Sequence, residues 1–481
     1  MPTIVPIDTP TLGDRGYLAH DGEVALVVDP QRDIDRVLAI AEDAGVRITH
    51  VFETHIHNDY LTGGYALAAT TGAAYHVNAE DQVAFDRVPV RDGDVVEVGA
   101  RLRIRVLATP GHTFTHLSYA LEHRADGEWT TAGVFTGGSL LYGSVGRPDL
   151  LGPEHTEALA RHQHASAHRL AELPESAEVL PTHGFGSFCS ATQSTAAAST
   201  IGVEKASNPA LTADVDSFLA ELLAGLDAWP AYYARMAPAN AAGPTAADLE
   251  LPRRADAAGI RAALDAGQWV VDLRNRVAFA AGHIAGTINV GLDGSFATYL
   301  GWIIPPDAGL VLLAETPEQV LEARRELSRI GVDPDAHAAG PIADLAGDKG
   351  LHSYPRAGFA DLAQVRHHRA VTVLDVRRNL EYADSHLPDV IHIPLHELYY
   401  RMDEVPDGEV WVHCAAGYRA AIAASMLAAG GRRVVHIDED YADAGSGSDS
   451  ASGNAGDAAN AAIPAPRAAG AVSADQPRAM P

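Results

Sequence analysis

The chain has 481 residues, of which 47% are hydrophobic and 20% charged, which is enough for about two to four globular domains of ordinary size. Its formal net charge of −28 argues against nucleic acid or an anionic membrane surface as a partner, because both would repel it. No apolar run approaches the roughly 20 residues of a membrane-spanning helix, and the first residues have no basic or apolar segment typical of a signal peptide, so we expect a cytoplasmic protein.

In the first half of the chain, short strands alternate with helices. We predict a strand over residues 22–30, a helix over 33–45 that Asp33 caps, and a strand over 47–54. A strand over 101–107 alternates apolar residues with arginines, which is typical of a half-buried strand. The last two strands run directly into loops that contain histidines, and loops of this kind are where an α/β scaffold can position metal ligands.

Three such loops carry the candidate metal site. The loop "THIHNDYLTGG" supplies His55 and His57, and "TPGHT" supplies His112. Imidazole is the commonest protein ligand for zinc and iron, and histidines at i and i+2 behind a strand can converge on one ion. Four further residues of these loops and of "PTHGFGSFCSA" are predicted to surround the ligands: Asp59, Tyr60, His183 and Cys189.

The second half of the chain contains an internal repeat. Residues 229–252 are rich in Pro, Ala and Gly and are predicted to be a connector. Beyond them, residues 270–290 align without a gap on residues 373–393, which predicts two tandem copies of one α/β unit. The aligned segments share several residue types: Asp272 and Asp375, Arg274 and Arg377, His283 and His386, and Ile288 and Ile391. Residues 441–481 are small and polar without periodicity, which predicts a disordered tail.

The stretch "VWVHCAAGYRAAIAASMLAAGG" places Cys414 between a predicted strand over 409–413 and a predicted helix that begins near Tyr418 and ends at Gly430. A thiol at this position faces the N–H groups of the turn and the positive end of a helix dipole, and both stabilise a thiolate. Arg419 adds a positive charge nearby. In a reducing cytoplasm, a lone cysteine is either a buried structural residue or a nucleophile, and the strand–turn–helix arrangement favours the nucleophile.

These residues resemble the rhodanese family of sulfurtransferases, on the strength of Asp375, Arg377, "SHLPDVIHIP" and "CAAGYRA". The resemblance implies that Cys414 takes up a sulfane sulfur as a persulfide and passes it to an acceptor. It also implies which residues hold this persulfide: Ala415, Ala416, Gly417, Tyr418 and Arg419. The upstream copy has Ala314 or Glu315 in place of the cysteine, so it resembles a non-catalytic rhodanese that serves packing or docking.

The first domain resembles the metallo-β-lactamase fold and, within it, the persulfide dioxygenases more than the glyoxalase II thioesterases. The resemblance extends from about residue 8 to 208 and includes "VVDPQRDID", "ETHIHNDYLTGG", "TPGHT" and "GRPDL". It implies one Fe(II) per chain, bound by His55, His112 and an aspartate, with zinc as the alternative metal. Gly138 stands in place of that aspartate, so the third position falls to His57, to water or to an anion. Tyr60 stands where dinuclear relatives have a histidine, which favours a single ion.

We therefore predict an α/β and α+β multidomain architecture with a metallo-β-lactamase αββα sandwich (1–240), a degenerate rhodanese-like domain (246–346), a rhodanese domain with Cys414 (355–440) and a disordered tail (441–481). The predicted function is iron-dependent oxidation of a low-molecular-weight thiol persulfide to sulfite, coupled to sulfur transfer through Cys414. The expected partners are the thiol persulfide, thiosulfate and sulfite, and further copies of the chain in a homo-oligomer.

Two alternative functions stay open. One is a metal-dependent (thio)ester hydrolase of the glyoxalase II type, in which Asp59 would orient the attacking water. The other is a rhodanese sulfurtransferase whose metallo-β-lactamase domain has lost catalysis. For Cys189, the alternatives are a carrier of sulfur in transit and a small buried residue after a Gly-rich turn.

Overall fold

The computed structural model describes residues 1–192 and 196–445. The first domain contains two six-stranded sheets. The first sheet runs in the order β1-β2-β3-β4-β5-β6, with α1 and α2 packed on its outer face. Its elements are β1 (Thr3–Thr9), β2 (Asp14–His20), β3 (Val24–Val28), α1 (Asp35–Asp43), β4 (Arg47–Phe52), α2 (Gly64–Thr71), β5 (Ala74–Asn78) and β6 (Val88–Val90).

The second sheet runs in the order β12-β11-β10-β9-β8-β7, and helices α3 to α6 cover its outer face. Its elements are β7 (Val95–Gly99), β8 (Leu102–Ala108), β9 (Leu117–Ala125), β10 (Glu128–Gly137), α3 (Pro153–Leu170), β11 (Glu178–Pro181), β12 (Ser199–Thr200), α4 (Ile201–Ser207), α5 (Pro209–Thr212) and α6 (Val215–Ala224). The two sheets pack face to face, because Leu26 and Phe52 of the first share an apolar core with Ile104 and Phe135 of the second. The first domain is therefore a four-layer αββα sandwich.

A connector with one helix, α7 (Tyr233–Ala242), leads to a mainly parallel sheet in the order β13-β17-β16-β14-β15. We call this part the middle unit. Its elements are β13 (Arg253–Arg254), α8 (Ala257–Asp265), β14 (Trp269–Asp272), α9 (Arg276–Ala281), β15 (Ile288–Asn289), α10 (Phe296–Ile303), β16 (Leu310–Ala314), α11 (Pro317–Ser328), β17 (Ala336–Ala339), α12 (Ile342–Ala346) and η1 (Gly347–Lys349).

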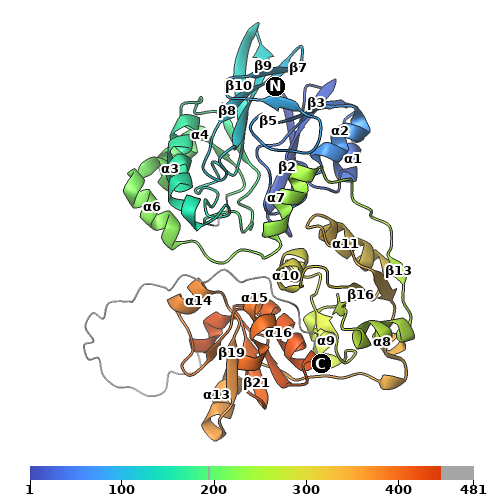
Figure 1. The fold of residues 1–481 in the computed structure, drawn as a ribbon. Helices are drawn as coiled ribbons and strands as arrows, with labels where there is room; N and C mark the ends of the chain where they lie inside the picture. Colours follow the sequence, from blue (N-terminus) through green and yellow to red (C-terminus); the bar gives the residue numbers. More distant parts are fainter. Residues whose placement is uncertain (193–195, 446–481) are drawn as a thin grey trace, which may run out of the picture.

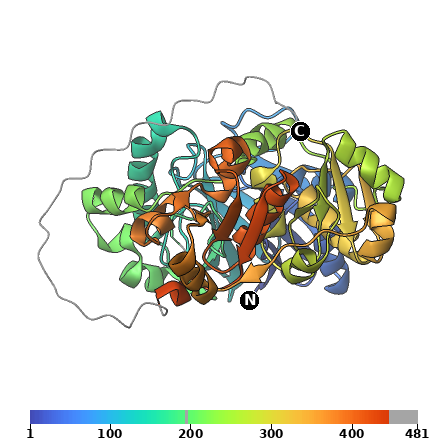
Figure 2. The same cartoon turned by 90° about the horizontal axis from the view of Figure 1, so that it is seen from below.

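The last unit has the same topology, with the order β18-β22-β21-β19-β20. Its elements are β18 (Arg356–Ala357), α13 (Phe359–His368), β19 (Thr372–Asp375), α14 (Asn379–Asp384), β20 (Ile391–His392), α15 (Leu395–Leu398), η2 (Tyr399–Glu404), β21 (Glu409–His413), α16 (Tyr418–Ala429), β22 (Arg433–Ile437) and η3 (Tyr441–Gly445). Figures 1 and 2 show the middle and last units side by side, next to the first domain.

The residues shared by the two repeat units make the same contacts in both. Arg274 Nη2 lies 2.6 Å from Asp272 Oδ2, and Arg377 Nη2 lies 2.7 Å from Asp375 Oδ2. All four side chains are buried. Each arginine thus neutralises the aspartate that ends the first long strand of its unit, so the repeat seen in the sequence is a repeat of structure.

One apolar cluster runs through all three parts of the molecule. It includes Tyr60 and Cys189 of the first domain, Trp302 of the middle unit and Cys414 of the last unit. Burying apolar surface at such interfaces stabilises the folded state by about 25 cal/mol per Å². The three parts are therefore packed into one body, in which the metal-ligand loops and the thiol loop both face domain junctions.

The structure differs from the sequence-based expectations at three places. Asp33 does not cap the first helix, whose N-cap is Ile34, but forms ion pairs with Arg36 and with Arg329 of the middle unit. The predicted connector contains α7, because its apolar side chains are buried against the neighbouring domains. Ordered chain continues past residue 440 as η3, where the Arg377 guanidinium lies 3.6 Å from the centroid of the Tyr441 ring. The rest of the predicted tail lies outside the described residues.

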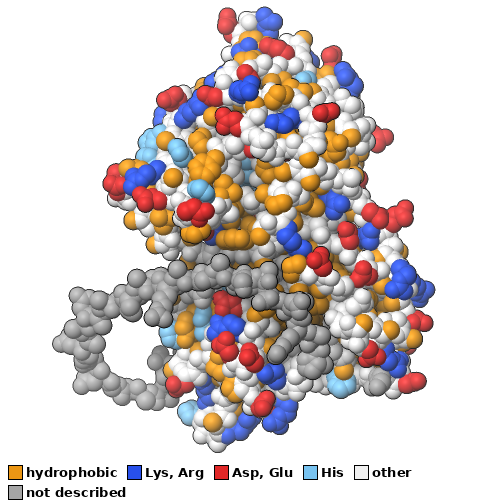
Figure 3. Space-filling model, in the orientation of Figure 1, with side chains coloured by type: hydrophobic (Ala, Val, Ile, Leu, Met, Phe, Trp, Pro, Cys, Tyr) orange, Lys and Arg blue, Asp and Glu red, His pale blue; other side chains and the backbone are white. Residues whose placement is uncertain are grey.

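The surface bears on the predicted partners. On the face drawn in Figure 3, acidic and basic side chains are interspersed on the first domain and the middle unit. Among the described helices, none is both long and apolar enough to cross a bilayer.

Candidate metal and sulfur-transfer sites

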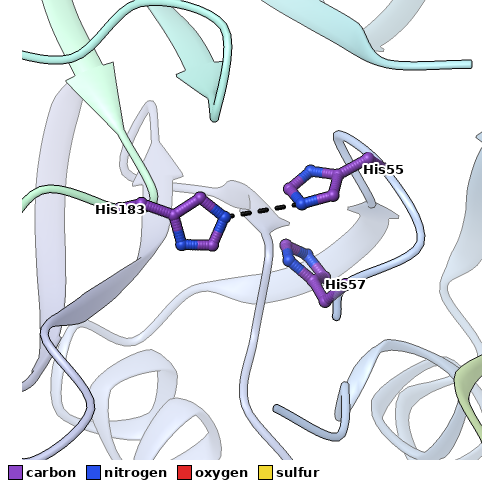
Figure 4. Close-up of side chains that lie close together, drawn as sticks. All are labelled: His55, His57 and His183. Atoms are coloured by element: carbon purple, nitrogen blue, oxygen red, sulfur yellow. Dashed lines mark hydrogen bonds between the residues drawn. The ribbon is translucent and has the colours of Figure 1, made fainter. Parts of the chain in front are cut away.

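Three loops that follow strands of the first domain bring four histidines together. His55 and His57 follow β4, His112 follows β8 and His183 follows β11, and all four side chains are buried. The ring centroid of His55 lies 4.1 Å from that of His57 and 4.8 Å from that of His112. The centroids of His112 and His183 are 5.2 Å apart. Figure 4 shows the His55 and His183 rings directed at each other, with His57 beside them.

Two overlapping groups of possible ligand atoms contain at least two of these histidines. One contains His55, His57 and His183, and the other contains His112, His183 and Cys189; within each group the atoms lie within 4.8 Å of one another. Within residues 1–192 and 196–445, no group of this kind holds the three predicted ligands His55, His57 and His112 together. His183, which we predicted to be a neighbour of the ligands, is the residue that the two groups share.

A buried carboxylate, Asp29, orients both histidines of the first loop. His57 Nε2 lies 3.2 Å from Asp29 Oδ1 and 3.1 Å from Glu53 Oε2. His55 Nδ1 lies 2.9 Å from the Thr54 hydroxyl, which donates to Asp29 Oδ2 at 2.7 Å. One nitrogen of each ring is therefore held, and the other, His55 Nε2 or His57 Nδ1, is left for a different partner.

The other two rings are also held through one nitrogen. His112 Nδ1 lies 2.8 Å from the carbonyl oxygen of Arg147. His183 Nδ1 lies 2.9 Å from Asp14 Oδ1 and 3.1 Å from Asp59 Oδ2. A histidine whose one N–H is bound by a carboxylate or carbonyl presents its second nitrogen to a metal, and this arrangement is typical of metal sites.

The cluster fits a bound metal ion. Among the residues that the structure describes, His57 Nδ1 and His112 Nε2 are buried and have no hydrogen-bond partner. A buried polar atom that stays unpaired costs about 1–3 kcal/mol, and coordination to a metal ion would remove this cost for either nitrogen. Imidazole suits zinc and iron alike, so the donor atoms do not choose between the two metals.

The protein environment divides the four histidines into two classes. Burial lowers the pKa of His112 to about 3 and that of His55 well below its usual value, so both rings are neutral. Burial acts in the same direction on His57 and His183, but the carboxylates beside them outweigh it. These charges raise the pKa of His57 to about 10 and that of His183 to about 9. Metal binding would therefore release protons from the site.

Gly138 leaves no room for the carboxylate that the sequence comparison places there. A Cβ atom at this position would lie 2.4 Å from Cδ2 of His112. The His112 ring thus occupies the space that a side chain at 138 would need. The residues present fit a metal held by imidazoles, but they do not fit a facial triad of two histidines and an aspartate at 138.

Tyr60 lies where a second ion would need a ligand. Its ring is fully buried, and its hydroxyl lies 3.0 Å from His57 Nε2 and 3.3 Å from the carbonyl oxygen of Asp29. Burial raises the pKa of the phenol well above its usual value, so the group stays neutral and is a poor metal ligand. This geometry supports a single ion.

Sequence reasoning missed Asp29 and Arg147, described above, and also two residues that act on the site from β2 and α7. Asp14, at the start of β2, holds His183, and burial together with the charge of Asp59 raises its pKa to about 7. Asn240 of α7 donates to the carbonyl oxygens of His57 and Tyr60 at 2.9 and 2.8 Å and accepts from the N–H of Thr62 at 2.9 Å. A polar residue inside an otherwise Ala- and Pro-rich segment was the only signal available for Asn240.

The second candidate site is the loop between β21 and α16. Cys414 is the buried residue that follows β21, and Gly417 is the N-cap of α16. Gly417 adopts φ +85°, and a Cβ there would lie 2.3 Å from Asp438 Oδ1, so this turn requires glycine. The thiol is thereby placed near the positive end of the helix dipole.

Arg419, predicted to hold a persulfide, is fixed by Glu381 of α14. Its Nη1 and Nη2 lie 2.6 and 2.7 Å from the two carboxylate oxygens. Burial alone would raise the pKa of Glu381, but the two hydrogen bonds and the charge of Arg419 lower it to about 2. The guanidinium is therefore pre-oriented beside the thiol loop by a bidentate ion pair.

The middle unit lies against the same loop. The Tyr418 hydroxyl donates to the carbonyl oxygen of Gly291 at 2.7 Å, and Arg276 Nε donates to Asp438 Oδ1 at 2.7 Å. Burial lowers the pKa of Arg276, but its hydrogen bond to Asp438 and its electrostatic interactions, which include one with Cys414, raise the pKa above the usual value. A second arginine charge thus acts on the thiol from outside its own unit.

The middle unit does not reproduce the thiol site. Glu315 follows β16 where Cys414 follows β21, and its N–H donates at 2.9 Å to Gln319 Oε1, the atom that also accepts from the N-cap Thr316 in the capping box of α11. Between the two units lies a narrow cleft, lined by Tyr299 and Trp302 of α10 and by Arg378 and Arg419.

Both the N-terminal and the C-terminal parts of the chain are similar to known proteins. Residues 359–444 match the family described as "Rhodanese-like domain". The chain is 34% identical over 185 residues to a hydroxyacylglutathione hydrolase of Maricaulis maris (strain MCS10), a match that covers 37% of this chain and 64% of that protein. It is 26% identical over 210 residues to "Persulfide dioxygenase ETHE1, mitochondrial" of Homo sapiens, covering 43% of this chain and 72% of that protein. The chain spans 57–64% of the length of three hydroxyacylglutathione hydrolases that it matches.

A solved structure supports the fold. The crystal structure of a metallo-beta-lactamase from Staphylococcus aureus subsp. aureus COL matches with a TM-score of 0.63 and 29% identity, covering 71% of this chain and 99% of that one. The predicted fold class is thus confirmed: the N-terminal region has the metallo-β-lactamase fold, and a rhodanese domain lies in the C-terminal part.

Proposed function

We propose that this chain metabolises sulfane sulfur, with Cys414 as a sulfurtransferase nucleophile and the first domain as a mononuclear metal centre that oxidises a thiol persulfide. The observation that carries the proposal is the combination of a rhodanese-like thiol loop with a buried cluster of oriented imidazoles in one body. The similarity to a protein named persulfide dioxygenase supports the same substrate class.

Cys414 performs the transfer step. Its thiolate attacks the outer sulfur of thiosulfate, the S–S bond breaks, and sulfite leaves with the electron pair. The persulfide on Cys414 then gives its outer sulfur to an acceptor thiolate. The N–H groups of the loop and the α16 dipole stabilise the thiolate and the persulfide anion. Arg378 and Arg419 line the cleft between the units and attract the anionic donor in a protein of net charge −28.

In the first domain, the cluster of His55, His57, His112 and His183 would hold the ion. A bound Fe(II) supplies the redox chemistry by which the persulfide, O₂ and water give the free thiol, sulfite and protons. The chain itself supplies orientation: Asp29 holds His57 directly and His55 through Thr54. Persulfide, the substrate of this site, can donate sulfane sulfur to Cys414, and sulfite, its product, can accept it. Fusing the two sites in one chain raises the effective concentration of both compounds.

Metal content and oxygen uptake test the proposal. Protein produced with added iron should contain one iron per chain, consume O₂ with glutathione persulfide and release sulfite. Thiosulfate:cyanide sulfur transfer should proceed in the same preparation. Iron-loaded protein that transfers sulfur but takes up no O₂ would contradict the oxidation step and leave a sulfurtransferase with a non-catalytic first domain.

Hydrolysis of a thioester is the second candidate, and the identity of 34% to a hydroxyacylglutathione hydrolase favours it. In this case Asp59 would orient the attacking water. Tyr60 and Gly138 count against it, because they stand in place of ligands to a second ion. Zinc-loaded protein that hydrolyses lactoylglutathione, with no O₂ uptake in the iron form, would establish the hydrolase and exclude the oxidation.

A further inference from the structure

The missing carboxylate at position 138 leaves one coordination position of the candidate metal site without its expected donor. Close to His112, the histidine that this donor would accompany, the structure places the thiol of Cys189. His112, His183 and Cys189 each offer a ligand atom within 4.8 Å of the others, and all three side chains are 0% exposed. A buried thiol within reach of two imidazole nitrogens supplies three of the four donors that a tetrahedral metal site needs.

One residue positions two of these donors. The backbone carbonyl of Arg147 lies 2.8 Å from His112 Nδ1, and the N–H of Arg147 donates to the carbonyl oxygen of Cys189 at 2.8 Å. The Cys189 N–H donates to the Ser187 hydroxyl at 3.2 Å. His112 and Cys189 are thus fixed relative to each other by the backbone of one residue, without help from a ligand.

Each histidine of this group also has one ring nitrogen that no carboxylate or carbonyl oxygen holds. His112 Nε2 is buried and has no hydrogen-bond partner in the described part of the chain. His183 is held at Nδ1 by Asp14 and Asp59, which leaves Nε2, 3.4 Å from His55 Nε2. His55 therefore lies at the edge of the same group and can supply a fourth donor.

We propose that Cys189 is a metal ligand that, together with His112 and His183, replaces the aspartate absent at position 138. This inference rests on the proposed metal site and changes its donor set from imidazoles alone to imidazoles with one thiolate. A thiolate is a softer donor than a carboxylate and binds zinc and iron well. It also restores the negative charge that an all-histidine site lacks, and it removes Cys189 from service as a free sulfur carrier.

Cobalt(II) as a spectroscopic probe tests the assignment, because thiolate ligation to Co(II) produces an intense near-ultraviolet charge-transfer absorption that imidazole ligation does not. The full-length protein, stripped of metal and titrated with Co(II), should show this band with one cobalt per chain. Cys189→Ser should lose the band, and its zinc affinity should fall by at least about tenfold. Cys414→Ser is the matched control, because it removes the other cysteine of the chain and should keep the band.

The outcomes separate the two proposals. Cobalt bound without the band, or a band that survives Cys189→Ser, overturns the thiolate assignment while leaving the metal site. A wild-type protein that binds no cobalt overturns the metal site and the thiolate together. Cys189→Ala serves as a second variant, and near-ultraviolet circular dichroism of both variants shows that the fold is intact. Loss of the band in both Cys189 variants, with or without loss of cobalt, supports the assignment.

Discussion

The two cysteines of this chain lie in opposite electrostatic surroundings. Burial and the charges of Asp59 and Asp14 raise the pKa of the Cys189 thiol well above its usual value. Cys414 lies at the N-terminal end of α16, with the positive charges of Arg419 and Arg276 acting on it. A thiol beside carboxylates ionises only when a cation binds, whereas a thiol beside arginines and helix N–H groups is ready to react. The same residue type is thus suited to metal binding in one domain and to nucleophilic attack in another.

The largest expected effect comes from removing the reactive thiol. Cys414→Ser should lower thiosulfate:cyanide transfer by about 10³-fold or more, because the serine hydroxyl forms no persulfide. Cys189→Ser should retain transfer, since Cys189 lies in the first domain beside His112 and His183. Transfer rates of the two variants measured side by side test the comparison directly. If the Cys189 variant lost transfer and the Cys414 variant kept it, the roles assigned to the two thiols would be reversed.

The second effect concerns the packing around the metal cluster. Gly138→Asp should lower the free energy of unfolding of the metal-free protein by about 1–3 kcal/mol, because its Cβ would meet the His112 ring at 2.4 Å. The displaced ring should also weaken zinc binding. Thermal or urea unfolding and a zinc titration measure the two consequences.

A control glycine separates crowding from a general effect of substitution. At Gly225 a Cβ would lie 3.6 Å from its nearest neighbours, which is ordinary contact, so Gly225→Ala should leave stability and zinc binding near wild type. A Gly138→Asp protein that is stable and gains O₂ uptake would mean that His112 swings aside and that the aspartate completes a conventional iron site.

The third effect is a pH dependence in the last unit. The folded-state pKa of Glu381 is about 2, below its usual value of 4.5, so its pairing with Arg419 stabilises the fold above pH 4.5. This contribution is lost as the pH falls from 4.5 toward 2, and it amounts to about 2 kcal/mol after allowance for partial exposure. Glu381→Gln should remove it, so the variant should be less stable at pH 7 and lose less stability between pH 4.5 and 2. Identical acid unfolding profiles would show that the pair contributes nothing.

The thiol site could be predicted from the sequence in more detail than the metal site. The strand over 409–413 and the helix that begins at Tyr418 are observed as β21 and α16, because one continuous strand–turn–helix segment carries its own signals in Gly417 and in apolar periodicity. The histidine loops were also recognisable. What could not be predicted is how separate segments meet. His183 lies at the centre of the cluster, Asp14 of β2 holds His183, and Asn240 of α7 holds the loop that carries His57.

These contacts could not be predicted because they form between segments that are far apart in the sequence. Asn240 is far along the chain from His57, and only the docking of α7 on the first domain brings the amide to the metal loop. Likewise, the absence of a side chain at Gly138 was visible in the sequence, but the ring of His112 that fills the space was not. Contacts between distant segments depend on tertiary packing, which local secondary-structure propensity does not predict.

The smallest expected effect tests whether the cysteine-free middle unit acts on the thiol or only packs against it. Arg276 of α9, whose side chain is 27% exposed, forms an ion pair with Asp438, and Asp438 lies against Gly417 of the thiol loop. Arg276→Gln should slow the alkylation of Cys414 at neutral pH about threefold, because the thiol loop loses one partly screened positive charge that favours the thiolate. The alkylation rate is measured at neutral pH in a Cys189→Ser background, together with the near-ultraviolet circular dichroism spectrum, which should stay unchanged. Arg261→Gln, which replaces an exposed arginine on α8 of the same unit, is the matched control and should leave the rate unchanged. An unchanged rate in the Arg276 variant would limit the middle unit to packing, and a changed spectrum would point to a distorted loop instead of a lost charge.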